Sequence, residues 1–179
     1  MTTVWPGRHT FPRCIEYSSG LPVARRRLSP LPMHIPVTAP TPVRVVAAVV
    51  RRYGRLLVCQ RAAHKRHGGL WEFPGGKLEA GESTLDGARR ELAEELDVVV
   101  RSVDEMEFSI QDPGSVYVIE FHPVEIDGEP RCIEHSALAW ATPEQLLELP
   151  LAPGDRAFAL HLQAAREADR ASPAVDRRR

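Results

Sequence analysis

Short blocks of hydrophobic residues follow one another from about residue 43 onward, and their pattern predicts several strands. Residues 43–51 are rich in β-branched side chains, and a second apolar run covers residues 56–61 after a turn at Tyr53 and Gly54. This arrangement is typical of a β-hairpin. Further extended segments are predicted at residues 71–73, 98–100, 106–111, 115–125 and 137–140, with turns at residues 112–114 and 126–130.

A helix is predicted over residues 83–96, directly after a glycine-rich loop. Ser83 is a good N-cap, and Asp86 lies where a capping box places its acidic partner. Apolar side chains share one arc of this helix: Leu85, Ala88, Leu92 and Leu96. Three carboxylates lie on the neighbouring arc: Glu91, Glu94 and Glu95. Such closely held charges indicate either a solvated acidic face or a site for a hard divalent cation such as Mg²⁺, which turns their repulsion into attraction.

Two more helices are predicted towards the C-terminal end. Thr142, Pro143 and Gln145 combine a cap, a proline in the first turn and a capping-box partner, which together predict a helix start. Asp155 is expected to open the last helix, which continues to about Ala168.

Prolines are concentrated at the beginning of the chain. Residues 1–42 contain eight of the sixteen prolines and show neither a helical nor a strand period. Because proline removes backbone donors and restricts the residue before it, we expect an extended or disordered leader. The folded domain is expected at residues 43–168, followed by a charged tail at residues 169–179. We hypothesise that the functional chain begins at Met33, so that deletion of residues 1–32 preserves function.

Composition limits the classes of partner. The chain has 179 residues, 43% of them hydrophobic, and a net charge of −1. This length suits one globular domain with some additional chain. The nearly neutral charge gives no global attraction to nucleic acid or to an acidic membrane, so a polyanionic partner would need a local cluster of charges.

The sequence also predicts a cytoplasmic protein. The longest apolar run near the start, residues 45–50, is far shorter than the ~18 residues that indicate a membrane span. Prolines soon after the arginines at 25–27 argue against an export signal. Three widely spaced cysteines, Cys14, Cys59 and Cys132, are an odd number and are typical of reduced thiols.

The predicted helix and the loop before it carry a spacing pattern that fixes many residue types. Gly76 is followed after five residues by Glu82, and after seven more by the run R-E-L-A-E-E-L-D-V, which begins at Arg90. This resembles the motif of the Nudix hydrolases, G-x5-E-x7-R-E-U-x-E-E-x-G-U, in which U is a bulky aliphatic residue. One fixed position differs, because Asp97 replaces a glycine that takes a left-handed backbone at the helix end. Aspartate tolerates that conformation at some cost, so we expect no loss of a metal ligand.

The resemblance implies an α+β protein with the Nudix fold, in which a mixed β-sheet is sandwiched between α-helices (α/β/α). Stretches outside the motif resemble the MutT-like branch: C-Q-R at 59–61, L-W-E-F-P-G-G-K at 70–77, E-H-S-A-L-A-W at 134–140 with T-P-E-Q-L after it, and L-A-P-G-D-R at 151–156. That branch implies hydrolysis of (deoxy)nucleoside triphosphates to a nucleoside monophosphate and pyrophosphate with Mg²⁺ or Mn²⁺. Sanitising of the nucleotide pool, with a substrate like 8-oxo-dGTP, is the expected role.

Other activities stay open. The substrate is alternatively CTP or 5-methyl-dCTP, or one of another Nudix specificity such as ADP-ribose or a dinucleoside polyphosphate. A remote alternative is a non-catalytic Nudix-like domain that senses a ligand, although such a domain would be expected to lose a motif carboxylate and none is lost here. The expected partner is a small-molecule nucleotide, with no direct nucleic acid and no membrane, and the chain is expected to be a monomer or a homodimer.

The resemblance also implies roles for individual residues. The expected metal ligands are Glu91, Glu94, Glu95, the backbone carbonyl of Gly75 or Gly76, and Glu134. Glu91 is alternatively the base that orients water, and Glu134 is alternatively a base as well. Arg90 is expected to orient Glu91 and to pair with Glu82. The expected substrate contacts are Arg61, Phe73, Lys77 and Asp155.

Four of these residues have a plain structural alternative. Arg61 is alternatively a strand-end residue, Glu134 an exposed loop carboxylate, and Phe73 a core side chain. Asp155 is either an N-cap of the last helix or the residue that faces the nucleobase. An ionised aspartate offers only acceptors, which suits the amino group of cytosine or the N1 and N2 groups of guanine. The basic loop at residues 62–69 is either a solvated loop or a flap that meets phosphate oxygens.

Overall fold

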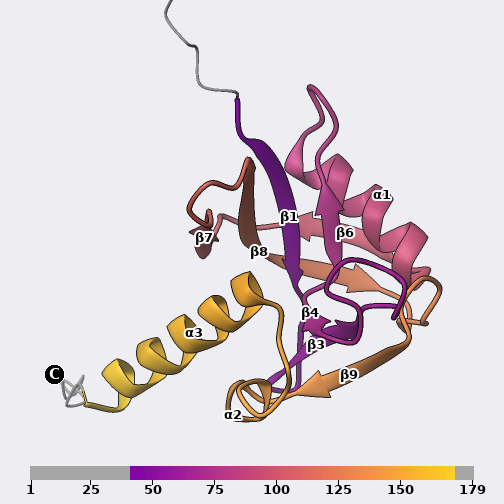
Figure 1. Ribbon diagram of the computed structural model, residues 1–179. Helices are drawn as coiled ribbons and strands as arrows, with labels where there is room; N and C mark the ends of the chain where they lie inside the picture. Colours follow the sequence, from indigo (N-terminus) through magenta and orange to yellow (C-terminus); the bar gives the residue numbers. More distant parts are fainter. Residues whose placement is uncertain (1–40, 172–179) are drawn as a thin grey trace, which may run out of the picture. The chain divides into compact units, whose positions relative to one another are not determined.

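The computed structural model describes residues 41–171 (Figure 1). Within that range the chain forms β1 (Val43–Val49), β2 (Arg51–Arg52), β3 (Arg55–Gln60), β4 (Trp71–Glu72), β5 (Gly75–Lys77), α1 (Thr84–Leu96), β6 (Val99–Val103), β7 (Phe108–Ile110), β8 (Tyr117–Asp127), β9 (Ala137–Ala141), α2 (Pro143–Leu146) and α3 (Pro153–Ala171). Nearly all of the predicted leader and most of the predicted tail lie outside the described residues.

Strands β1 and β8 run parallel at the centre of one sheet, whose order is β5-β1-β8-β6, with β7 also paired to β8. A second sheet has the order β2-β3-β4, with β9 paired to β3. Strand β5 is antiparallel to β1 and pairs Gly75 with Ala47 and Gly76 with Val46. This register holds the glycine-rich segment against a buried strand, a few residues before α1 begins.

Alternate residues of β1 face two separate hydrophobic cores. Val46 and Ala48 pack in one core with Leu92 of α1, and Ala47 packs in a second core with Phe158 of α3. Complete burial of a side chain such as Leu92 or Phe158 contributes about 1.5–3 kcal/mol to stability. Figure 1 shows α1 and α3 on opposite sides of β1. The predicted α+β class, with a mixed sheet between helices, is therefore confirmed.

Both ends of α1 agree with the sequence prediction. The side chain of Ser83 accepts a hydrogen bond of 3.1 Å from the backbone N–H of Asp86. Asp97 takes the left-handed conformation, with φ 57° and ψ 44°, and its N–H donates to the carbonyl of Ala93. The Asp97 carboxylate also pairs with Arg131, which ties the end of α1 to the loop that follows β8.

Several element boundaries differ from the prediction, and two of the differences have a clear structural cause. Strand β8 continues to Asp127, where a turn was predicted, because Val99 of β6 pairs with that residue. Helix α3 begins at Pro153 and ends at Ala171, so Asp155 lies inside its first turn and the prediction that Asp155 opens the helix was wrong. Proline suits the first helical position because its fixed φ is helical and its missing N–H would have no partner there.

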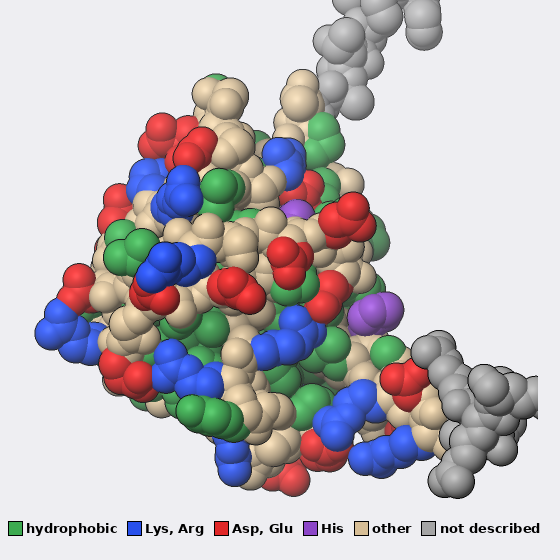
Figure 2. All heavy atoms as spheres, turned by 180° about the vertical axis from the view of Figure 1, so that it is seen from behind, with side chains coloured by type: hydrophobic (Ala, Val, Ile, Leu, Met, Phe, Trp, Pro, Cys, Tyr) green, Lys and Arg blue, Asp and Glu red, His purple; other side chains and the backbone are tan. Residues whose placement is uncertain are grey.

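Charges of both signs are mixed on the face that lies behind the view of Figure 1. Figure 2 shows blue and red side chains next to one another on this face, as expected for a chain with a net charge of −1. In residues 41–171, every helix is too short or too polar to cross a lipid bilayer.

Candidate active site

A cavity of about 410 Å³ is lined by residues of β1, β4 and β5, the end of α1, the loop after β3 and the start of α3. It brings together predicted site residues that are far apart in the sequence: Arg61, Phe73, Gly75, Gly76, Lys77, Glu95 and Asp155. The other predicted residues, Arg90, Glu91, Glu94 and Glu134, are not part of its lining. We call the part of the cavity at Glu95 its α1 end and the part at Asp155 its α3 end.

Glu95 is the buried carboxylate at the α1 end. Only 8% of its surface is exposed, and its Oε2 accepts a hydrogen bond of 2.9 Å from the N–H of Gly75. Burial raises the pKa of Glu95 to about 7, although the hydrogen bond from Gly75 and the nearby His135 act in the opposite direction. A carboxylate that is costly to ionise in this position is one that a bound cation would stabilise.

Arg90 holds two of the motif carboxylates. Its guanidinium donates to both oxygens of Glu82, at 3.0 and 2.9 Å, and to Oε1 of Glu91 at 2.7 Å. The pKa of Glu82 is lowered, first by these hydrogen bonds and then by the one from the N–H of Glu79. The contacts predicted for Arg90 with Glu82 and Glu91 are therefore present, whereas its part in the reaction stays a prediction.

The glycines of β5 leave room for carboxylates. A Cβ at Gly76 would collide with the carboxyl group of Glu91, and a Cβ at Gly75, where φ is +140°, would collide with the carbonyl of Val46. Only glycine therefore fits at either position without a shift of its neighbours. As a result, the oxygens of Glu91 and Glu95 lie next to the backbone of one short strand.

The remaining two predicted ligands, Glu94 and Glu134, are not part of the cavity lining. Glu94 is exposed on α1, and Glu134 forms an ion pair of 2.7 Å with Lys65. Across residues 41–171, no three His, Cys, Asp or Glu side chains already converge on one point. The carboxylate and backbone donors at the α1 end are nevertheless all oxygens, and the carboxyl group of Glu91 lies directly against the backbone of Gly76. This donor set fits a hard cation such as Mg²⁺, which keeps several waters and needs few protein ligands.

Asp155 is the buried carboxylate at the α3 end. It is 7% exposed, and its Oδ1 accepts a hydrogen bond of 2.8 Å from the N–H of Phe73. Burial raises the pKa of Asp155 to about 7, against the effect of that hydrogen bond. The ring of Phe73 packs in the core, edge-on to Phe158 with 5.3 Å between ring centroids. Phe73 therefore reaches the cavity through its backbone, which orients Asp155.

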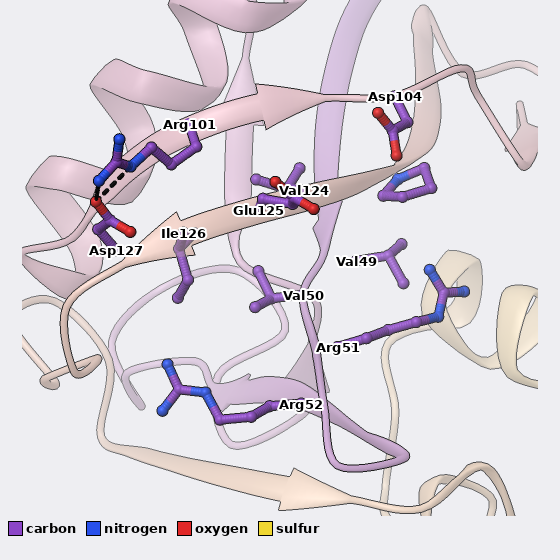
Figure 3. Close-up of a pocket in the computed structure, with 11 residues that line it drawn as sticks. Val49, Val50, Arg51, Arg52, Arg101, Asp104, Val124, Glu125, Ile126 and Asp127 are labelled. Atoms are coloured by element: carbon purple, nitrogen blue, oxygen red, sulfur yellow. Dashed lines mark hydrogen bonds and ion pairs between the residues drawn. The ribbon is translucent and has the colours of Figure 1, made fainter.

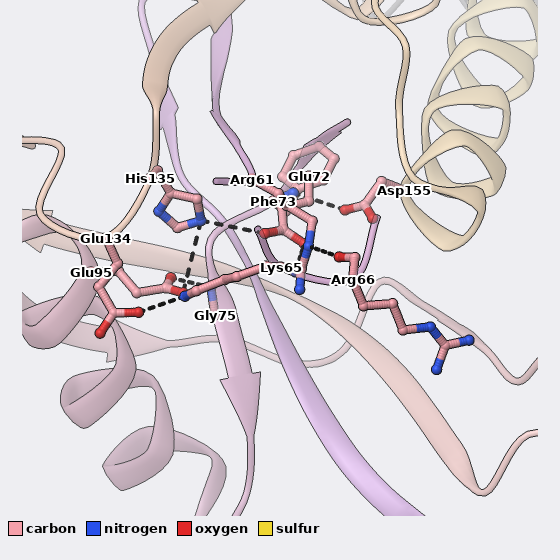
Figure 4. A network of polar contacts seen from close by, with 10 residues as sticks. All are labelled: Arg61, Lys65, Arg66, Glu72, Phe73, Gly75, Glu95, Glu134, His135 and Asp155. Atoms are coloured by element: carbon pink, nitrogen blue, oxygen red, sulfur yellow. Dashed lines mark hydrogen bonds and ion pairs between the residues drawn. The ribbon is translucent and has the colours of Figure 1, made fainter. Parts of the chain in front are cut away.

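Basic side chains lie between the two ends. Arg61 pairs with Glu72, and its Nε donates to the carbonyl of Arg66 at 2.7 Å. Lys77 places its Nζ over the ring of Tyr117, 4.8 Å from the centroid. Sequence reasoning named the basic loop as a possible flap but did not name its cavity-lining residues, Lys65, Arg66 and His67. Figure 4 shows Arg61, Lys65 and Arg66 in this part of the site.

Sequence reasoning also missed Glu72 and His135. The imidazole of His135 is 3% exposed, and its Nε2 lies 3.3 Å from Oε1 of Glu72 and 3.8 Å from Oε1 of Glu95. Both residues belong to stretches that resemble the MutT-like branch, W-E-F and E-H-S, and this was the available signal. Figure 4 shows His135 between the two glutamates.

A second cavity, of about 390 Å³, lies between β8, β6 and the start of β2 (Figure 3). Apolar residues such as Val50 and Ile126 line it together with three arginines, each already paired with a carboxylate: Arg51 with Glu107, Arg52 with Glu129, and Arg101 with Asp127. None of the residues predicted for the site lines this cavity. The first cavity is therefore the candidate active site.

Comparison with known proteins agrees with this geometry. A family model described as the NUDIX domain matches residues 40–162. The Escherichia coli (strain K12) protein named CTP pyrophosphohydrolase is 42% identical over 134 residues, which cover 71% of this chain and 98% of that protein. The Haemophilus influenzae protein named 8-oxo-dGTP diphosphatase is 33% identical over 91 residues, or 49% of this chain and 67% of that protein.

A solved structure leads to the same family. The crystal structure of the MutT NUDIX hydrolase from Burkholderia pseudomallei aligns with a TM-score of 0.58 and 28% identity, over 67% of this chain and 96% of that chain. The chain therefore belongs to the Nudix family, and the prediction of a Nudix hydrolase of MutT-like type is confirmed.

Proposed function

We propose that this protein hydrolyses a nucleoside triphosphate to a nucleoside monophosphate and pyrophosphate, with Mg²⁺ or Mn²⁺ as the cofactor. One observation carries the proposal: a single cavity joins the carboxylate end at α1, a row of basic side chains and the buried Asp155 at α3. These groups match the parts of a nucleotide: the metal site and the basic side chains suit its polyphosphate, and Asp155 suits the hydrogen-bonding edge of its base.

The α1 end is the proposed centre of reaction. Glu91, Glu94 and Glu95 would hold the metal, with the backbone of Gly75 or Gly76 beside them. When bound, the metal neutralises charge on the phosphate oxygens and lowers the pKa of a nucleophilic water. The protein's own contribution is positioning: Arg90 fixes Glu91, and Gly75 fixes Glu95.

Basic side chains of the cavity are the proposed phosphate contacts. Lys65, Arg66 and Lys77 line it from the loop after β3 and from β5. Arg61 is held by Glu72 and by the carbonyl of Arg66, so we assign it first to fixing the loop and then to phosphate binding. Arginine and lysine at such positions favour a substrate with several negative charges.

The α3 end is the proposed base site. One oxygen of Asp155 is held by Phe73, and when the carboxylate is ionised it presents only acceptors to the cavity. We therefore infer a base with N–H donors, either an oxidised guanine as in 8-oxo-dGTP or a cytosine as in CTP and 5-methyl-dCTP. The name of the Haemophilus influenzae relative supports the first and that of the Escherichia coli relative the second. Preference for oxidised dGTP would make sanitising of the nucleotide pool the cellular role.

A substrate panel tests this proposal. The full chain with Mg²⁺ is assayed on 8-oxo-dGTP, dGTP, CTP, 5-methyl-dCTP, UTP, ADP-ribose and a dinucleoside polyphosphate, and products are identified by chromatography. We expect a nucleoside monophosphate and pyrophosphate from a guanine or cytosine nucleotide, and no turnover after chelation of the metal. Absence of triphosphate turnover contradicts the proposal, and preference for ADP-ribose or a dinucleoside polyphosphate moves the protein to another Nudix specificity. Glu95→Gln protein, purified in the same way, controls for contaminating phosphatases.

We also infer a cytoplasmic location. Both cysteines of the described residues, Cys59 and Cys132, carry free thiols, which supports a reducing compartment. Cell fractionation with an antibody against the chain checks this, and recovery in an exported fraction contradicts it.

A further inference from the structure

The loop that carries His135 is anchored at both of its ends. Three backbone hydrogen bonds hold it: Arg131 N–H to the Leu96 carbonyl at 2.9 Å, Ile133 N–H to the Glu95 carbonyl at 3.0 Å, and Ser136 N–H to the Gln60 carbonyl at 2.9 Å. The first two occupy carbonyls at the end of α1 that have no partner within the helix. Residues 131–136 thus connect the helix that carries Glu95 to strand β3.

The imidazole of His135 is enclosed between two carboxylates. Its Nε2 lies 3.3 Å from Oε1 of Glu72, a hydrogen bond, and 3.8 Å from Oε1 of Glu95. Carboxylate oxygens are acceptors, so the hydrogen must be on Nε2. Its Nδ1 is buried and has no partner in the described structure, and a bare acceptor there costs less than an unpaired N–H would.

Contacts continue from His135 into the wall of the cavity. Glu72 uses its second oxygen to bind Arg61, and Arg61 binds the carbonyl of Arg66. Figure 4 shows these groups as one connected network that reaches from Glu95 to the basic loop. A single imidazole therefore lies between the proposed metal-holding carboxylate and the side of the cavity that faces the phosphates.

Removal of this imidazole would leave two carboxylates facing a void. Glu72 would lose its donor, and no group would remain between its carboxylate and that of Glu95, so the two would repel whenever both are ionised. Either carboxylate would then turn away from its present position. Mutation of a residue that hydrogen-bonds to a metal-binding carboxylate typically lowers metal affinity or activity by about 10- to 100-fold, so the effect of such a movement is measurable.

We propose that His135 is a positioning residue whose Nε2–H binds Glu72 and keeps Glu95 in place at the α1 end of the cavity. The proposal rests on the proposed function only in that Glu95 is taken to hold the metal. It adds a residue to the site and implies that metal affinity depends on a side chain which is not itself a ligand.

Substitution by two amides tests where the hydrogen-bond donor must lie. In His135→Gln the side-chain amide can place an N–H near the position of Nε2, whereas in His135→Asn the shorter side chain places it near Nδ1. We expect Mn²⁺ binding by the full chain, measured from the free-ion electron paramagnetic resonance signal, to weaken about tenfold in His135→Asn and His135→Ala. His135→Gln is expected to stay within about threefold of the unsubstituted protein.

The matched control is Ile133→Ala, in the same loop. Its side chain is 58% exposed and its backbone N–H keeps the bond to Glu95, so Mn²⁺ affinity should not change. Thermal melts establish that each variant is folded, and the Gln and Asn pair still decides if His135→Ala does not fold. Equal affinity in His135→Asn and the unsubstituted protein, or equal loss in both amides, overturns the proposal. Because Mn²⁺ binding needs no substrate, this result is independent of whether any triphosphate is hydrolysed.

Discussion

The two ends of the cavity contain carboxylates that are almost equally buried and have almost the same raised pKa. Glu95 and Asp155 are both less than a tenth exposed, and burial raises the pKa of each to about 7. Each accepts one backbone hydrogen bond from the same short segment, Glu95 from Gly75 and Asp155 from Phe73. Their protonation equilibria alone would not tell a metal ligand from a base-reading residue.

What differs is the set of groups around each carboxylate. Glu95 has Glu91 one turn before it on the same helix and His135 and Glu72 across from it. At the other end, Asp155 has Arg61 as well as Glu72 near enough to act on its pKa, in opposite directions, and Ile119 packs closely against Gly154 beside it. Several anionic groups together attract a metal cation, whereas a single carboxylate near an arginine and an apolar side chain suits a hydrogen-bonded ring. Neighbours, and not burial, therefore distinguish the two functions.

The strongest test of this distinction is Glu95→Gln. Loss of a carboxylate that holds the metal should lower kcat by more than about 100-fold. Mutation of a residue that only hydrogen-bonds to a metal ligand usually costs about 10- to 100-fold. It should also weaken Mn²⁺ binding, which is measured by calorimetry on the full chain. Asp155→Asn is the matched substitution at the other end and should leave Mn²⁺ affinity within twofold. Equal loss of Mn²⁺ affinity in both variants would show that the two ends are not distinct.

The reverse test is the effect of Asp155→Asn on base preference. Asparagine keeps an acceptor for the N–H of Phe73 but turns an amide donor towards the cavity. The ratio of kcat/KM for CTP to that for UTP should fall by about tenfold or more, because a hydrogen bond to a charged group contributes about 1.5–3 kcal/mol. Initial rates with both nucleotides measure it. An unchanged ratio in an active variant would refute a base-reading role for Asp155.

The α1 end was largely predictable from the sequence, and the reason is local geometry. On a helix, the spacing between Glu91 and Glu95 fixes their relative direction without any knowledge of the rest of the fold. The caps at Ser83 and Asp97 are local for the same reason, and both agree with the structure. Family resemblance added the glycines, whose need for space becomes visible only when β5 pairs with β1.

The α3 end and the centre of the site could be predicted only in part. The hydrogen bond between Phe73 and Asp155 joins residues 82 positions apart, so it depends on how α3 packs on the sheet. The ion pair between Lys65 and Glu134 joins two loops that are far apart in the sequence, so no local sequence pattern predicts it. His135 was overlooked because a histidine beside an acidic residue in a loop usually indicates a solvated pair, whereas here backbone anchors bury its ring.

The pKa of Asp155 leads to a prediction about stability. Its ordinary value is 3.8 and burial raises it to about 7, so the folded protein binds this proton more tightly than the unfolded chain. The contribution to stability is therefore complete below pH 3.8 and is lost as the pH rises through about 7. Between pH 5 and 8, the free energy of unfolding should fall by at least about 1 kcal/mol more in the unsubstituted protein than in Asp155→Asn. Urea titrations in the presence of EDTA measure this, and parallel pH profiles would contradict it.

The smallest expected effect concerns the end of α1, where Asp97 occupies a left-handed position. Glycine adopts that conformation without strain, and relief of the strain is worth roughly 1 kcal/mol. Asp97→Gly also loses the ion pair with Arg131, in which both side chains are more than half exposed and which is worth at most about 1 kcal/mol. The free energy of unfolding should therefore rise by between about 0 and 1 kcal/mol, measured by urea titration, with Arg131→Ala as the control for the ion pair alone. Mn²⁺ affinity should stay the same, because Ile133 still anchors the loop to Glu95 through its backbone. A loss of Mn²⁺ affinity in Asp97→Gly would mean that the cap, and not the group of carboxylates around Glu95, gives the α1 end its distinct character.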